Sequence, residues 1–191
     1  HGDEELFTRE QMVQWFDGSH LSKSPAQWDP AKLAWVNAQH LKRADDARLA
    51  SLVAIQLARR GVQAEPAWLE RVCALFKDRC STTVEIAEWA LAFVGDNIVV
   101  PDAEIAPQRH DTTRAAIADL ANRLAAAPAW DAPSIAAAMK AVLVEHKLKM
   151  PQLAVPVRLL ALGRAQTPSV DAVLALFDRQ RLISRLRAGP G

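Results

Sequence analysis

The 191-residue sequence has no tyrosine, only seven glycines, only two cysteines and no long hydrophobic run. It has no apolar stretch of about 18 residues, the length that a membrane-spanning helix requires. It also begins without the basic and apolar segments of a signal peptide. Because glycine is scarce while alanine and leucine are abundant, the composition favours helices over sheets. We therefore expect an all-α protein of the cytoplasm that has no membrane partner.

The two cysteines, Cys73 and Cys80, lie within one apparent helical pattern. At about 1.5 Å per residue their backbones would be roughly 10 Å apart, which is too far for a disulfide. Two free thiols are typical of a reducing compartment. No Cys-x-x-Cys or His-x-x-x-His spacing and no glycine-rich phosphate loop occurs, and the histidines are scattered. The sequence therefore predicts neither a metal site nor a catalytic residue.

The charge is unevenly distributed along the chain. The formal net charge is only +1, but residues 149–191 contain seven Lys or Arg against two Asp or Glu. Such a basic end can match the dipole of a C-terminal helix, and it can also bind nucleic acid. The six tryptophans lie mainly on apolar helical faces, so we expect them to pack in the core rather than to stack on bases.

Helix-start and helix-stop signals divide the chain into about ten helices. Capping residues are expected at Thr8, Asp29, Thr82, Asp131 and Thr167, and stops at Gly18, Gly61, Gly95 and Gly163. The expected helices cover residues 9–16, 30–41, 45–60, 66–77, 83–94, 112–127, 135–147, 151–162 and 168–176, and the last runs into a basic tail. Pro101 and Pro107 lie in an irregular span, where we place a boundary between helical subdomains 29–110 and 111–191.

The stretch from Lys149 to Ser169 is the most informative part of the chain. It contains a short apolar helix that prolines open and Gly163 closes. Arg158 stands among Val, Leu and Pro on this helix. A cation at this position must either point out of the core toward a partner or form an ion pair within the core. A salt bridge to Asp171 or Asp178 is the structural alternative.

The pattern Met-x5-Pro-Val-Arg-Leu-x3-Gly-x3-Thr-Pro-x-Val in this stretch resembles the C-terminal anticodon-binding half of bacterial glutamyl-tRNA synthetases. The resemblance continues upstream at residues 22–37 and 78–82. Ser22-Lys23-Ser24 also looks like the tail of the Lys-Met-Ser-Lys-Ser signature of class I synthetases, but the Lys-Met half is absent. We therefore interpret Lys23 as a contact to the tRNA backbone rather than to ATP.

The resemblance implies two helical subdomains that form an anticodon-binding cage, preceded at residues 1–28 by the end of a stem-contact region and a linker. It implies that Arg158 hydrogen-bonds an anticodon base in a pocket that Thr167 and Val170 line. It implies, on a looser match, that Arg79 checks the third anticodon base; a structural role at a helix turn is the alternative. Arg164 and Gln166, in the loop after the helix, are further candidates for contacts to the tRNA backbone.

The resemblance also implies a larger enzyme. A glutamyl-tRNA synthetase joins glutamate to tRNA(Glu) with ATP and Mg²⁺, and its N-terminal catalytic domain precedes the region matched here. The absent start methionine agrees with a piece of a longer protein, which we expect to be inactive alone, monomeric and not to bind DNA. Two alternatives remain: the anticodon cage of a class I lysyl-tRNA synthetase, and a helical protein–protein scaffold with no RNA role.

Overall fold

The computed structural model describes residues 5–19, 21, 24, 27–95 and 98–188. These residues form eleven α-helices and two short 3-10 helices, without a strand among them. The all-α prediction is therefore confirmed for the described part of the chain. No helix in that part is both long enough and apolar enough to cross a lipid bilayer.

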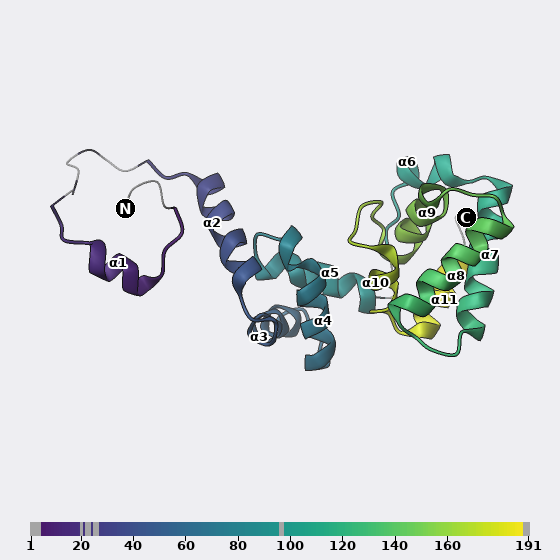
Figure 1. Cartoon of the computed structure of the whole chain (residues 1–191), viewed down its shortest axis with the longest axis horizontal. Coiled ribbons are helices and arrows are strands. Elements are labelled where there is room, and N and C mark those ends of the chain that lie inside the picture. Colours follow the sequence, from purple (N-terminus) through teal and green to yellow (C-terminus); the bar gives the residue numbers. More distant parts are fainter. Residues whose placement is uncertain (1–4, 20, 22–23, 25–26, 96–97, 189–191) are drawn as a thin grey trace.

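The first group of helices lies in the centre of Figure 1. It contains α2 (Pro30–Arg43), α3 (Asp46–Ala58), α4 (Pro66–Phe76), the 3-10 helix η1 (Lys77–Arg79) and α5 (Thr83–Val94). Helices α3, α4 and α5 pack against one another around fully buried side chains such as Leu57, Phe76 and Ile86. The short α1 (Arg9–Trp15) lies apart from them in this view.

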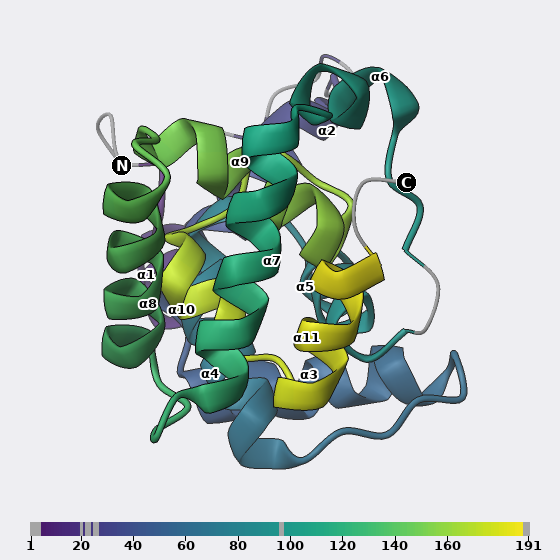
Figure 2. The same cartoon turned by 90° about the vertical axis from the view of Figure 1, so that its right-hand side faces the viewer.

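The second group contains the remaining helices. They are α6 (Asp102–Ile105), η2 (Ala106–Gln108), α7 (Asp111–Ala126), α8 (Ala132–Glu145), α9 (Met150–Leu162), α10 (Val170–Leu174) and α11 (Arg179–Ala188). Helix α7 contacts α8, α9 and α11, as Figure 2 shows. Leu120, Met139 and Leu153 are fully buried in this group. The predicted boundary between two subdomains stays a prediction.

Several of the predicted helix ends are confirmed. Thr8 forms a complete capping box with Gln11, and the Asp29 carboxylate accepts hydrogen bonds from two backbone N–H groups of the first turn of α2. Asp131 caps α8 in the same way through the N–H of Ser134. Gly163 ends α9 in the left-handed conformation at φ 69°. Each signal depends on atoms within a few residues, which explains why it can be read from sequence.

The predicted helix start at Thr167 is wrong. Its hydroxyl donates to the carbonyl of Pro168 at 2.9 Å, and Ser169 is the first cap residue of α10. The helix also ends at Leu174, and the basic tail is a separate helix. The Asp178 carboxylate accepts from the N–H of Arg181 at 2.9 Å and so opens α11. The cap at Asp178 therefore separates α10 from α11, where the sequence analysis predicts one continuous helix.

Gly95 and the second cysteine also differ from expectation. Helix α5 ends at Val94 with Gly95 as its C-cap, so the predicted stop is confirmed, but Gly95 has φ −66° and is not left-handed. A Cβ on it would come within 3.1 Å of the Leu91 carbonyl oxygen, so limited space there favours glycine. Cys80 lies beyond the end of η1 and not in the helix of Cys73. Both thiols are free and buried, and burial raises the pKa of Cys73 to about 12.

The tryptophan prediction holds for some positions and fails for others. The indole N–H groups of Trp68 and Trp130 donate to the carbonyls of Leu176 and Phe177 at 2.7 and 2.8 Å. Trp28, by contrast, is 72% exposed. Trp35 is exposed as well. Only the C-terminal end of α2 is buried, so the apolar pattern at its N-terminal end lacks a partner among the described residues.

Candidate nucleic-acid interface

Arg158 projects from α9, a helix with Pro at its start, a buried Pro156 inside it and Gly163 at its end. Its guanidinium is half-buried and donates to the Pro168 carbonyl at 3.4 Å, a long hydrogen bond. The Nε atom is buried and has no hydrogen-bond partner in the structure. Burial lowers the pKa of Arg158, and the nearby charge of Arg79 lowers it further.

The salt bridge considered for Arg158 does not form among the described residues. Their ion pairs do not include one from Arg158 to Asp171 or Asp178, and Asp178 instead caps α11. A partly buried cation with an unsatisfied N–H is costly to keep unless it meets an acceptor at some stage of function. Arg158 thus has one buried N–H for which the described residues supply no acceptor.

Arg79 ends η1, directly after α4, and its side chain is exposed. It lies close enough to Arg158 for its charge to disfavour the second cation. Arg79 belongs to the first group of helices and Arg158 to the second, so two residues from distant motifs lie within electrostatic range of each other. Like charges repel, so an anion or a set of hydrogen-bond acceptors near both guanidinium groups would stabilise them.

Thr167 and Val170 are only 7% and 6% exposed, and the Thr167 hydroxyl is already bonded to Pro168. Their predicted role as the lining of a base pocket stays a prediction. Gln166 is exposed in the same loop. Lys23, the other predicted contact to the RNA backbone, lies outside the described residues.

Arg164 follows Gly163 and lies across an aromatic ring of the first group of helices. Its guanidinium carbon is 4.2 Å from the ring centroid of Trp89, a cation–π distance. Trp89 in turn stacks on Phe76 with 4.6 Å between centroids and 25° between planes. The loop after α9 is thereby attached to α5. The stacking also fixes the plane of the exposed Arg164 guanidinium.

A protein-family model described as the anticodon binding domain matches residues 38–190. The chain belongs to this family.

Curated relatives of this anticodon-binding domain are named glutamate–tRNA ligase. The chain is 55% identical to the ligase of Paracidovorax citrulli over 190 residues, which are 98% of this chain and 39% of the relative. It is 53% identical to the ligase of Albidiferax ferrireducens, again over 98% of this chain and 40% of the relative. The chain thus spans about two fifths of the length of these relatives.

The fold agrees with solved structures of the same type of protein. A glutamate–tRNA ligase from Elizabethkingia meningosepticum superposes with a TM-score of 0.88 at 18% identity, over 98% of this chain and 37% of that one. A glutamate–tRNA synthetase from Elizabethkingia anophelis gives a TM-score of 0.78 at 19% identity, over 97% and 36%. At these identities the likeness establishes the fold of the anticodon-binding domain and no more.

Sequence reasoning missed how this anticodon-binding domain uses its basic C-terminal helix. Arg185 of α11 donates to the carbonyls of Ala161 at 2.6 Å and Ala92 at 2.8 Å, and also to that of Gly95. Arg179 likewise donates to the carbonyl of Leu124 at 2.9 Å. These acceptors are carbonyls at or near the C-terminal ends of α5, α7 and α9, where the helix dipole favours a cation. Part of the basic charge at the C-terminus therefore joins helices within the domain.

Proposed function

We propose that this anticodon-binding domain binds the anticodon loop of tRNA(Glu) as part of a glutamate–tRNA ligase. The observation that carries the proposal is the half-buried guanidinium of Arg158, whose buried Nε has no partner among the described residues; the charge of Arg79 lies nearby. Proteins read single-stranded loops by hydrogen bonds to the Watson–Crick edges of unstacked bases. A planar guanidinium donates bidentately to such edges, and Arg158 and Arg79 supply one each.

The chemistry of aminoacylation belongs to the rest of such a ligase. The chain spans about two fifths of its curated relatives. Its described residues bring together no group of three or more His, Cys, Asp or Glu side chains that could hold a metal ion. We therefore place ATP and Mg²⁺ in an N-terminal catalytic domain outside this chain. The chain alone would then act as a monomeric RNA-binding module of a cytoplasmic enzyme that does not bind DNA.

The apolar surface near the start of the chain supports contact with that catalytic domain. Met12, Val13, Phe16 and Leu21 are all exposed around α1. A hollow of about 380 Å³ lies among them, with Phe7 and Trp15 in its wall. An exposed apolar surface of this kind marks a contact with another protein surface. The larger part of a glutamate–tRNA ligase, which this chain does not include, is the occupant that we propose.

The test is binding of fluorescently labelled anticodon stem-loops to the purified chain. A stem-loop with the anticodon of tRNA(Glu) should bind more tightly than one whose anticodon bases are altered. The logarithm of the affinity should fall linearly with the logarithm of salt concentration, because bound lysines and arginines release counterions from phosphates. Equal affinity for both loops would refute the proposal, and ATP–pyrophosphate exchange by the pure chain would refute the division of labour.

The two alternatives make different predictions in the same assay. A protein–protein scaffold would bind RNA weakly, without anticodon preference. An anticodon cage of a class I lysyl-tRNA synthetase would prefer the anticodon of tRNA(Lys). The glutamate–tRNA ligase names of the relatives favour the glutamyl reading over the lysyl one.

A further inference from the structure

A basic hollow lies on the α2 side of the first group of helices. Its volume is about 530 Å³, and α2, the start of α3 and the start of α5 form its walls. The lining residues are Asn37, His40, Leu41, Arg43, Ala44, Arg48, Leu49, Leu52, Thr82 and Thr83. Three of them are basic and none is acidic.

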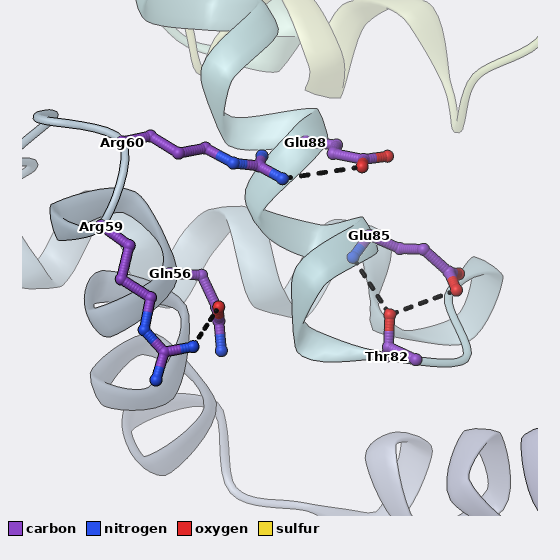
Figure 3. A network of polar contacts seen from close by, with 6 residues as sticks. All are labelled: Gln56, Arg59, Arg60, Thr82, Glu85 and Glu88. Atoms are coloured by element: carbon purple, nitrogen blue, oxygen red, sulfur yellow. Dashed lines mark hydrogen bonds and ion pairs between the residues drawn. The ribbon is translucent and has the colours of Figure 1, made fainter.

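The two arginines of this hollow differ from those at the far end of α3. Arg43 and Arg48 are exposed, and neither guanidinium makes an ion pair or hydrogen bond within the described part of the chain. Arg59, by contrast, donates to Gln56 at 3.2 Å, and Arg60 pairs with Glu88 at 3.8 Å (Figure 3). Arg43 and Arg48 thus keep their guanidinium N–H donors available, whereas Arg59 and Arg60 do not.

The carboxylates nearest to the hollow are engaged elsewhere. Asp45 accepts from the backbone N–H of Arg48 at 2.9 Å and so caps α3. Asp46 pairs with Lys77 at 2.9 Å. Glu85 accepts from the backbone N–H of Ser81 at 2.8 Å. It also accepts from the Thr82 hydroxyl, as Figure 3 shows. The positive charge of the hollow is therefore not offset by a carboxylate in its lining.

The hollow adjoins the helical turn that contains Arg79. The side-chain amide of Asn37, in the hollow, donates to the carbonyl of Ser81. Ser81 follows Arg79 by two residues, and α2 packs directly against η1, which contains Arg79. A strand held at Arg79 and Arg158 would therefore continue within reach of His40 and Arg43.

We propose that this hollow binds phosphodiester groups of the RNA arm that adjoins the anticodon loop. The inference rests on the proposed function and adds a second contact to it, of a different chemical kind. Guanidinium groups bind phosphate oxygens bidentately, and such contacts fix orientation without reading the base sequence. The arginine pair would read bases, and Arg43 and Arg48 would fix the direction in which the RNA leaves.

The test is the salt dependence of stem-loop binding by the double variant Arg43→Ala/Arg48→Ala. Removing two phosphate contacts should reduce the slope of log affinity against log salt by about 1.4 to 1.8. The ratio of affinities for matched and altered anticodons should stay at the wild-type value. Arg59→Ala is the matched control, since it removes an exposed arginine of α3 that lies outside the hollow, and its slope should not change.

A second measurement locates the contact on the RNA. Stem-loops carrying one neutral methylphosphonate at a time should show at least one stem position where wild-type affinity falls but affinity of the double variant does not. An unchanged slope in the double variant, or the absence of such a position, would overturn the inference. Equal wild-type affinity for matched and altered loops would instead overturn the proposed function, while a changed slope would still place RNA in the hollow.

Discussion

Replacing Arg158 by alanine should leave the fold intact and weaken RNA binding. The guanidinium makes a hydrogen bond of 3.4 Å, longer than the usual 2.7–3.2 Å, and its buried Nε has no partner. Burial and the charge of Arg79 both disfavour its cationic form, as its lowered pKa indicates. The folded chain therefore gains little from this charge, and we expect the free energy of unfolding to change by under about 0.5 kcal/mol.

Loss of RNA binding should be larger than this loss of stability. A bidentate contact to a base edge contributes about 1–3 kcal/mol of discrimination. This corresponds to a roughly 5- to 150-fold fall in affinity for the matched loop. Arg158→Lys should also bind poorly, because an ammonium group cannot present a planar pair of donors. Arg158→Met controls for packing, since it keeps an unbranched apolar side chain in the half-buried position.

The assay combines urea unfolding with fluorescence anisotropy, using a matched loop and a loop altered at one anticodon base. All three variants should lose most of the difference in affinity between the two loops. If Arg158→Ala lowers the free energy of unfolding by more than about 2 kcal/mol and keeps the anticodon preference, Arg158 is a structural residue and the reasoning fails.

Three further changes test the packing of the domain. Arg185→Ala should lower the free energy of unfolding by about 1.5–3 kcal/mol, because it removes charged hydrogen bonds to the ends of α5 and α9. The control is Arg187→Ala, at an exposed position of the same helix, which should change the free energy of unfolding little in the same urea titration. Gly163→Ala should destabilise more than Gly61→Ala: both have positive φ, near 70°, but a Cβ at Gly163 would come within 2.5 Å of a backbone oxygen whereas the space around Gly61 is open. Thermal unfolding of the two variants checks the order, and equal losses would contradict it. Asp119→Asn should reduce the loss of stability on acidification, because the hydrogen bond from Arg123 lowers the pKa of Asp119. The stabilisation by the Asp119 carboxylate is complete above the pKa of about 3.9 that the carboxyl has in the unfolded chain, and it is lost as the pH falls through the lower pKa of the folded chain. A parallel pH dependence of urea unfolding in wild type and variant would refute this prediction.

Local chemistry in the sequence was sufficient for much of the secondary structure. The caps at Thr8, Asp29 and Asp131 and the stop at Gly163 lie where the sequence predicts them. Each needs only a side chain and a backbone group a few residues away, or a single residue with positive φ. At Thr167 the local signal misled, because its hydroxyl bonds the Pro168 carbonyl and Ser169 precedes the first residue of α10.

Tertiary structure alone decided which residues meet. Arg158 was recognisable as an unusual cation on an apolar helix, but its proximity to Arg79 arises from the packing of separate helices. The same holds for Arg185, whose acceptors lie at the ends of α5 and α9. Which cation lies at the end of which helix, and which buried donor lacks a partner, depends on how distant segments pack in space. The sequence by itself therefore identified most of the helices and the unusual arginine, and their packing determined which arginines join helices and which stay exposed.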